Sequence, residues 1–341
     1  MFRKASLSAA IALAVFGQGV SAAGYEFRHQ VNGLAAKLAE SAPKGATDID
    51  CGYDHCYALV NGTVWSVGRN DSGQLGRDAT VDQFTWGATN LSGVSVISAG
   101  RYHGYAIKDG TVWSVGSNAY GQLGRNGTSD QHTWGPTTLT GVAEISAGYL
   151  HGYALKGGEV YSVGLNNYGQ LGTGNNTNKS VWVSSGISGV SSVTAGGEYG
   201  YALKDGVVWS VGYNHYGQLG RNGTTNQTTW APTNLSGVTQ IASGALHGYA
   251  LKDGVVWSVG RNNHGQLGLG NANNTSAWTP SNASDISKIS AGAYFAHAIG
   301  VDGSSWSVGE NANGQLGFGD NAMRTSWEKL PEDAFTQEVS P

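Results

Sequence analysis

Four histidines occupy the same position of a repeating unit, and they are the first side chains to consider for chemistry. They are His55, His103, His151 and His247, and the same position holds Tyr199 and Phe295 in the other two units. Neutral imidazole is a common metal ligand, so a ring of metal-binding histidines is one interpretation. However, aromatic residues replace histidine in two units, and ligands one repeat apart seldom reach one ion. We therefore expect structural histidines, with no metal and no other cofactor.

The two cysteines, Cys51 and Cys56, are a second candidate for chemistry, and both lie in the first unit. The second unit has Ala99 and Gly104 in their places. The pair flanks the four-residue loop 52–55, where two strand ends should lie close enough to be bridged. Metal binding is the weaker interpretation because Cys-x4-Cys supplies only two ligands. We expect a disulfide, formed in an oxidising compartment.

Catalytic motifs are missing from the sequence. It contains no Gly-x-Ser-x-Gly elbow, no His-Glu-x-x-His and no Gly-Lys-Ser/Thr phosphate loop, and its carboxylates are scattered. A lyase-type activity at the centre of the fold would need a cluster of titratable groups that the sequence does not display. We expect a protein that is not an enzyme.

The repeating unit itself predicts the fold. A Trp/Tyr-Ser-Val-Gly motif ends at Gly68, Gly116, Gly164, Gly212, Gly260 and Gly309, at intervals of 48, 48, 48, 48 and 49 residues. In the second unit we expect strands at 104–108 and 111–116, joined by the turn Asp109-Gly110, and another strand starting near Leu139. Dipeptides of this kind accept positive φ and favour two-residue hairpins.

About four short strands per unit, without helical periodicity or capping repeats, fit a propeller blade better than a solenoid coil. The sequence therefore predicts an all-β protein with one closed β-propeller over residues 49–330. Six blades are expected, with seven as the alternative. Residues 23–48 form a lead segment with a helix expected at 30–41, and the tail 331–341 is a candidate closing strand.

The amino terminus has the pattern of a secretory signal peptide over residues 1–22. Arg3 and Lys4 are followed by an apolar run at 5–16 and by the small-residue site Val20-Ser21-Ala22. We expect a secreted or periplasmic protein, with an uncleaved anchor as the alternative and no membrane span after cleavage. The net charge of −4 and a charged fraction of 12% lack the basic footprint that nucleic-acid binding requires.

Two linked motifs carry a family resemblance across residues 49–330. Ile/Val-x-Ala-Gly-x-x-His-x-x-Ala-Leu, followed by Val-Trp-Ser-Val-Gly-x-Asn-x-x-Gly-Gln-Leu-Gly, resembles the regulator-of-chromosome-condensation repeat. The resemblance implies a β-propeller, usually of seven blades. The founding member is a nuclear nucleotide-exchange factor that binds a small GTPase and chromatin. That activity is not expected here, because this chain has an export signal, an acidic balance and no wedge-like insertion. A secreted bacterial β-lactamase inhibitor is the nearer analogue, so we expect an exported, bacterial-type member.

Two loops vary between units while their frame stays fixed. They are the residue pair after Ala-Gly and the pair before Gly-Gln-Leu-Gly, and both should emerge on one face because successive connections alternate between faces. The candidate binding residues on this face are Tyr53, Arg101, Tyr102, Tyr120, Tyr149, Tyr168, His215, Tyr216, His264 and Tyr294. The Gly-Gln-Leu-Gly motif is expected to hold the fold. Tryptophan recurs at two positions of the unit, which we call the two tryptophan columns. The first column, which includes Trp113, is expected to pack between blades. The second column, which includes Trp134, lies in a longer polar stretch; burial at a blade edge is expected, with an exposed aromatic band as the alternative.

A surface rich in tyrosine is typical of protein interfaces, since tyrosine offers a large contact area with few rotamers to freeze. We therefore expect a non-catalytic binding module for a protein partner. A glycan-binding surface protein or adhesin is the first alternative, because tyrosine stacks on sugar rings. A secreted enzyme inhibitor is the second. The simplest interpretation is that tyrosine only packs against its neighbours here.

Overall fold

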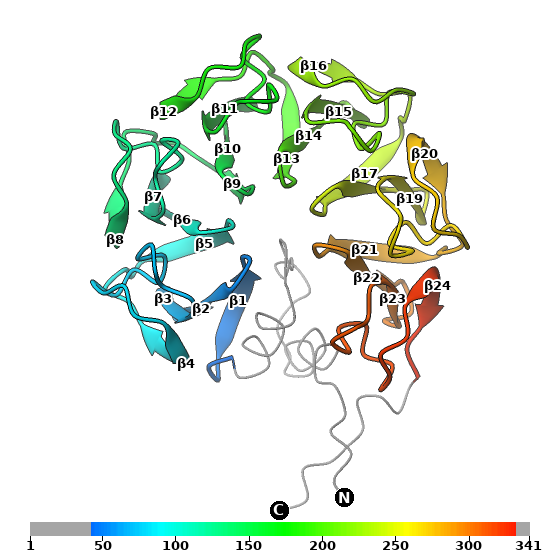
Figure 1. Ribbon diagram of the computed structural model, residues 1–341, viewed down its shortest axis with the longest axis horizontal. Coiled ribbons are helices and arrows are strands. Elements are labelled where there is room, and N and C mark those ends of the chain that lie inside the picture. The colour runs from blue at the N-terminus through cyan, green and yellow to red at the C-terminus, as the bar shows by residue number, and fades with distance from the viewer. Residues whose placement is uncertain (1–41, 332–341) are drawn as a thin grey trace, which may run out of the picture.

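In the computed structural model, residues 42–331 are described, and they form twenty-four strands and no helix. The strands make six four-stranded antiparallel sheets, which are the blades of a ring (Figure 1). The predicted all-β propeller with six blades is therefore confirmed. The predicted signal peptide, the expected helix at 30–41 and residues 332–341 of the tail lie outside the described residues. No helix in the described part of the chain could cross a membrane.

The first three blades follow the first three repeats. Blade 1 consists of β1 (Ala46–Cys51), β2 (His55–Val60), β3 (Thr63–Gly68) and β4 (Gln83–Ala88). Blade 2 consists of β5 (Val94–Ala99), β6 (His103–Lys108), β7 (Thr111–Gly116) and β8 (Gln131–Pro136). Blade 3 consists of β9 (Glu144–Ala147), β10 (His151–Lys156), β11 (Glu159–Gly164) and β12 (Lys179–Ser184).

The last three blades repeat this order. Blade 4 consists of β13 (Val190–Ala195), β14 (Tyr199–Lys204), β15 (Val207–Gly212) and β16 (Gln227–Pro232). Blade 5 consists of β17 (Val238–Ser243), β18 (His247–Lys252), β19 (Val255–Gly260) and β20 (Thr275–Pro280). Blade 6 consists of β21 (Ile286–Ala291), β22 (Phe295–Gly300), β23 (Ser305–Gly309) and β24 (Arg324–Lys329). In each blade the first strand lies at the centre and the fourth at the rim (Figure 1).

The turn between the second and third strands is a two-residue hairpin in blades 1 to 5. Asp109 and Gly110 have φ of 50° and 70°, as a type I′ turn requires, and Lys108 pairs directly with Thr111. The turn predicted at Asp302-Gly303 is different, because Ile299 pairs with Ser305 across a five-residue loop. The longer loop accounts for the interval of 49 residues before Gly309.

Two strand predictions for the second repeat need correction. The longer polar stretch around Trp134 is not a loop before the next strand but is itself the outer strand β8. The strand expected near Leu139 begins only at Glu144, as the inner strand β9 of blade 3. Leu139 lies in the connection between them and is buried there, so its apolar side chain gave a strand-like signal outside a strand.

Successive blades are joined by a buried tyrosine and a buried tryptophan. Tyr57 of blade 1 lies edge to face with Trp134 of blade 2, with ring centroids 5.4 Å apart, and its hydroxyl donates to the carbonyl of Gln74 at 2.5 Å. The same ring pair recurs at four more junctions, as Tyr105 with Trp182, Tyr153 with Trp230, Tyr201 with Trp278 and Tyr249 with Trp327. Apolar side chains of both blades surround each pair, so the core lies between blades.

The other tryptophan column is half-buried at the edges of these clusters. Trp113 packs against the cluster between blades 1 and 2, and Trp257 packs against the one between blades 4 and 5. The ammonium of Lys108 lies 5.5 Å from the ring centre of Trp113. A cation over an aromatic face shields it from water while adding a favourable electrostatic contact. Both tryptophan columns thus serve the packing of blades, as expected.

The first and last repeats differ from the second repeat at two positions that pack between blades. A Cβ atom added at Gly104 would overlap the ring of Tyr57, so repeat two requires glycine there. Repeat one has Cys56 at this position, and repeat six has His297 in place of the tyrosine. Within residues 42–331 the inner strands pack in sequence from β1 to β21, and no packing of this kind joins β21 to β1.

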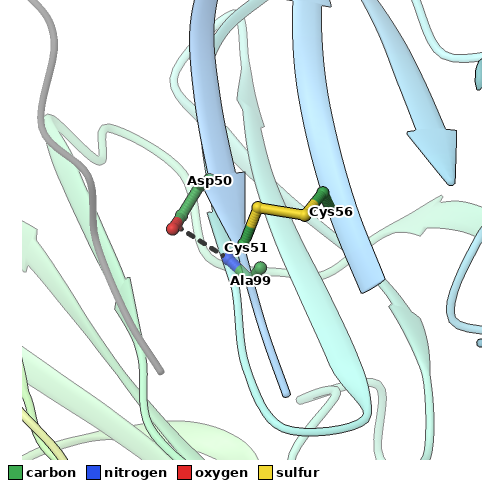
Figure 2. Close-up of a disulfide and its surroundings, with 4 residues drawn as sticks. All are labelled: Asp50, Cys51, Cys56 and Ala99. Atoms are coloured by element: carbon green, nitrogen blue, oxygen red, sulfur yellow. Dashed lines mark hydrogen bonds between the residues drawn. A yellow bond between two sulfur atoms is a disulfide. The ribbon is translucent and has the colours of Figure 1, made fainter. Parts of the chain in front are cut away.

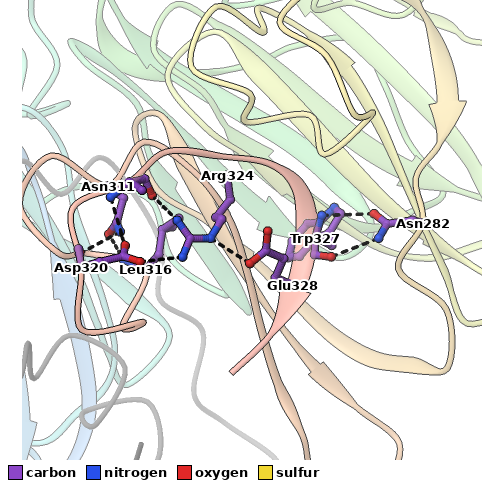
Figure 3. Close-up of polar contacts among 8 residues, drawn as sticks. Asn282, Asn311, Leu316, Asp320, Arg324, Trp327 and Glu328 are labelled. Atoms are coloured by element: carbon purple, nitrogen blue, oxygen red, sulfur yellow. Dashed lines mark hydrogen bonds and ion pairs between the residues drawn. The ribbon is translucent and has the colours of Figure 1, made fainter. Parts of the chain in front are cut away.

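Blade 6 is tied to blade 5 by side-chain contacts to the backbone of β24. The amide of Asn282 donates to the Trp327 carbonyl at 3.0 Å and accepts from the Trp327 N–H at 3.1 Å (Figure 3). On the same strand, Arg324 pairs with Asp320 and Glu328, each at 2.8 Å. These contacts fix the position of the last outer strand relative to blade 5.

Candidate functional site

The two variable loops of each blade lie together on one face, which we call the loop face. In blade 2 the N–H of Ser117, at the start of the longer loop, donates to the carbonyl of Tyr102 at 2.9 Å. Equivalent bonds join Arg69 to Asp54 at 2.8 Å and Tyr213 to Glu198 at 3.0 Å. The face with the hairpin turns lies at the other strand ends, and we call it the turn face.

The conserved frame of the repeat fixes the backbone of the longer loop. In blade 2 the Oδ1 of Asn118 accepts from the N–H of Leu123 at 2.9 Å, and its Nδ2 donates to two carbonyls at 3.0 Å. The side chain of Gln122 accepts from the N–H of Tyr120 at 2.9 Å. Leu123 is fully buried. The Gly-Gln-Leu-Gly motif thus fixes the loop that presents the variable residues.

The shorter loops form a chain of backbone hydrogen bonds around the centre of the loop face. The N–H of Arg101 donates to Tyr149 at 3.3 Å, Tyr149 donates to Gly197 at 3.0 Å, and Gly197 donates to Ala245 at 3.1 Å. Large side chains occupy this position in blades 1 to 3, whereas Gly197, Ala245 and Ala293 occupy it in blades 4 to 6. The inner rim is therefore asymmetric.

A first cluster of candidate residues surrounds Arg101. Its guanidinium carbon lies 4.8 Å from the ring centre of Tyr53, 5.1 Å from that of Tyr102 and 5.4 Å from that of Tyr149. The guanidinium of Arg69 also lies over Tyr102, at 5.2 Å. Arg69 is paired with Asp71 at 2.5 Å and lies 3.6 Å from Asp54. The first cluster thus consists of Tyr53, Arg69, Arg101, Tyr102 and Tyr149.

A second cluster lies over blades 3 to 6. Tyr168 contacts Tyr213 with centroids 4.7 Å apart, and His215 contacts Tyr216 at 5.2 Å. Arg261 bridges two blades, since its guanidinium lies 5.3 Å from the ring centre of Tyr216 and 5.4 Å from that of Tyr294. His264 contacts Tyr294 at 5.1 Å. The second cluster consists of Tyr168, Tyr213, His215, Tyr216, Arg261, His264 and Tyr294.

Nine of the ten predicted residues thus fall into the two clusters. Tyr120 belongs to neither and is 40% exposed. The prediction missed Arg69, Tyr213 and Arg261, which occupy the position directly after Ser-Val-Gly. The first residue of the longer loop also varies between repeats, as Arg69, Ser117, Leu165, Tyr213, Arg261 and Glu310. Including this position among the variable ones would have found the three missed residues.

Burial shifts the acidity of two groups near the centre of the loop face. It raises the pKa of the Tyr149 phenol, and Tyr294 raises it further. Burial also raises the pKa of the Glu198 carboxyl, while the positive charge of Arg101 opposes this effect. Glu198 is a single carboxyl without a carboxylate partner in either cluster.

The histidine column lies away from the loop-face surface. His55, His103, His151 and His247 are fully buried, and each contacts the tyrosine two residues later, as His103 contacts Tyr105 at 4.9 Å. Burial lowers the pKa of His55 and of His247 to about 3. In the described part of the chain no three His, Cys, Asp or Glu side chains are gathered to hold a metal ion. The histidines therefore act in packing.

Cys51 and Cys56 form a disulfide between neighbouring strands (Figure 2). Both are buried on the flank of blade 1 with Ile49, Ala58 and Val67. Beside them, the carboxylate of Asp50 accepts from the N–H of Ala99 in blade 2 at 2.9 Å. The bridge thus stiffens the start of the first blade below the loop that bears Tyr53.

Six blades built from one repeat, with variable loops on a single face, define the class of protein as a repeat-built β-propeller. The chain belongs to the RCC1-like domain family, whose model matches residues 12–339. The family resemblance read from the sequence is thereby confirmed. RCC1-like propellers are a type of protein-interaction scaffold. Their usual count of seven blades contrasts with the six described here.

Solved structures share the fold. Human WBSCR16 is 24% identical with a TM-score of 0.75, over 85% of this chain and 82% of that chain. Yeast RCC1 (Prp20), in a structure with Kap60 bound, is 21% identical with a TM-score of 0.74, over 84% of this chain and 75% of that chain. No protein with a curated description matches the sequence. At these identities the likeness shows the fold alone.

Proposed function

We propose that this protein is an exported, non-catalytic binding module that holds a protein partner on its loop face. The observation that carries the proposal is the gathering of tyrosine and arginine side chains from all six blades in two clusters over a hydrogen-bonded frame. Tyrosine and arginine are enriched in protein interfaces and in their energetic centres. A frame that is already ordered lowers the entropic cost of association.

The family supports a protein partner over other ligands. Yeast RCC1 has been crystallised with Kap60, and the structure of Prp20p from Saccharomyces cerevisiae was described together with its binding to Gsp1p and histones. Those partners belong to those proteins. What we carry over is the use of an RCC1-like propeller as a surface for another protein.

Two features support export. The first 22 residues have the basic start, apolar run and small-residue site of a signal peptide. The buried Cys51–Cys56 disulfide suits an oxidising compartment, since thiols remain reduced in the cytosol. Mass spectrometry of the chain recovered from secreted and envelope fractions would show whether its amino terminus begins after Ala22. An uncleaved terminus in a cytosolic fraction would contradict export.

The proposed function is tested by capture. The intact chain is immobilised and incubated with the secreted and envelope proteins of the organism that makes it, with and without soluble sugars. We expect one protein to be retained in near-equal molar amount, with retention unchanged by the sugars. Retention abolished by a sugar, together with binding to a glycan array, would replace the proposal by a glycan-binding function.

A further inference from the structure

Arg101 differs from every other arginine in residues 42–331 because its guanidinium has no hydrogen-bond acceptor within that range. Three arginines contact carboxylate or amide oxygens, as Arg69 with Asp71, Arg324 with Asp320 and Arg261 with Asn263. Three more donate to serines of their own blades, as Arg77 with Ser66, Arg125 with Ser114 and Arg221 with Ser210. The guanidinium of Arg101 instead lies over the rings of Tyr53, Tyr102 and Tyr149.

The Nε of Arg101 is buried without a partner, while the residue as a whole is half-buried. Aromatic rings stabilise a cation, but they do not accept the in-plane hydrogen bonds of a guanidinium. An unmade hydrogen bond from a charged, partly desolvated donor is costly. The three rings therefore hold a binding group in place and leave its in-plane donors to be satisfied from outside the fold.

The charge around Arg101 favours a ligand with one negative charge. Asp71 already neutralises Arg69, and Glu198 acts on Arg101 electrostatically from beyond ion-pair distance. A dianionic phosphate would be repelled by Glu198, and nucleic acid would require several free cations. A planar carboxylate matches the guanidinium fork and can accept two parallel hydrogen bonds.

We propose that Arg101 is the anchor for a carboxylate, the side chain of an aspartate or glutamate on the partner protein. This inference rests on the proposed function, and it assigns the chemistry of the contact at the centre of the loop face. The rings of Tyr53, Tyr102 and Tyr149 then flank the ion pair and exclude water from it. Exclusion of water strengthens such a pair.

The anchor can be tested without knowing the partner. The probe is N-acetyl-glutamic acid α-amide, whose only charge is the side-chain carboxylate, and its neutral twin is N-acetyl-glutamine amide. NMR of the intact chain labelled with ¹⁵N-arginine follows the Nε–Hε signals, and the signal missing from Arg101→Lys identifies Arg101. We expect this signal to shift saturably with the acid, with an affinity at least about tenfold above that of the neutral twin.

Two variants sharpen the result. Glu198→Gln removes a competing negative charge, so it should tighten binding of the acid by about two- to fivefold. Lys156→Met removes one positive charge at the turn face, beside Gly157, and should leave the affinity unchanged. Equal shifts with the acid and its neutral twin, no shift of the Arg101 signal, or weaker binding of the acid by Lys156→Met would each overturn the anchor.

Failure of the anchor can be told apart from failure of the proposed function. If a captured protein binds equally well to the parent chain and to Arg101→Met, the binding module stands and the anchor is wrong. If the acid probe binds at Arg101 but no protein is captured, the site stands and the proposed partner class is wrong.

Discussion

The hydroxyl of Tyr105 in blade 2 donates to the backbone carbonyl of Gln122, the glutamine of the Gly-Gln-Leu-Gly motif in the same blade. The ring of Tyr105 also contacts Trp182 of blade 3, with centroids 5.5 Å apart. One side chain thus ties the loop frame of its own blade to the packing between blades. The recurrence of this tyrosine in five repeats explains how the same sequence unit both builds the ring and fixes the loop face.

Replacing Tyr105 by Phe should destabilise the fold, because the Gln122 carbonyl loses its donor in a buried site. We expect the free energy of unfolding to fall by about 1–3 kcal/mol, measured by urea denaturation. The matched control is Tyr120→Phe, at a residue that is 40% exposed, where the change should stay within about 0.5 kcal/mol. Equal effects of the two variants would contradict the structural role of the Tyr105 hydroxyl.

Gly124 should be intolerant of any side chain. Its φ is +68°, and a Cβ atom would overlap the indole nitrogen of Trp182 in the next blade. We expect Gly124→Ala to lower the free energy of unfolding by about 2–5 kcal/mol. Gly127, three residues later, has open space around it, so Gly127→Ala should be nearly neutral in the same denaturation experiment. A neutral Gly124→Ala would contradict the packing between blades.

The Cys51–Cys56 bridge closes a short loop, so it should stabilise the fold modestly. The loop-entropy relation for six residues gives about 2 kcal/mol. The double variant Cys51→Ala, Cys56→Gly reproduces the residues of repeat two, and its unfolding midpoint should equal that of the reduced parent chain. Thermal denaturation with and without reductant checks this. A reductant effect that persists in the double variant would have another cause.

Acid should weaken the fold through the buried histidines. Burial lowers the pKa of His247 to about 3, below the ordinary value of 6.5. Between these two values the unfolded chain binds the proton and the folded chain does not, so stability falls as the pH drops from about 6.5 toward 3. The slope is at most about 1.4 kcal/mol per pH unit for each histidine.

This acid sensitivity can be tested by replacing His247 with the residue found at the equivalent position of blade 6, Phe295. His247→Phe places in blade 5 the residue that blade 6 has at the same position, so the loss of stability between pH 7 and pH 4 should be smaller than in the parent chain. Above pH 7 the His247 contribution does not change with pH. Denaturation curves collected across this range measure both effects. An unchanged acid slope would show that His247 does not titrate on unfolding.

Much of the fold could be predicted because two adjacent residues in each repeat specify its hairpin turn. Asn61-Gly62 and Asp109-Gly110 adopt positive φ at both residues, which few other dipeptides tolerate. The loop at Asp302 was not predicted because its Asp-Gly dipeptide is the same as in other repeats, while the connection is one residue longer. The outer strand β8 was not predicted because its residues alternate only weakly between apolar and polar, and its Trp134 is buried against the preceding blade.

The candidate site could be predicted only as a set of loop positions. Which residues contact one another depends on the curvature of the ring, since Arg101 meets Tyr53 and Tyr149 from two other blades. Arg261 likewise joins Tyr216 to Tyr294 across three blades. Neither contact has a signal in the local sequence. That the Arg101 guanidinium lacks a hydrogen-bond acceptor within residues 42–331 could be recognised only from the structure, by comparison with the other described arginines.

The central claim is that the loop face binds a protein, and a comparison of the two faces tests it most directly. Equilibrium binding of the captured protein would be measured for the parent chain, for a variant with Tyr102, Tyr120, Tyr168 and Tyr216 changed to Ala, and for a variant with Lys108, Lys156, Lys204 and Lys252 changed to Ala on the turn face. Circular dichroism would confirm that both variants fold. We predict at least a hundredfold loss of affinity, about 2.7 kcal/mol, in the tyrosine variant only. Undiminished binding by the folded tyrosine variant would contradict the account.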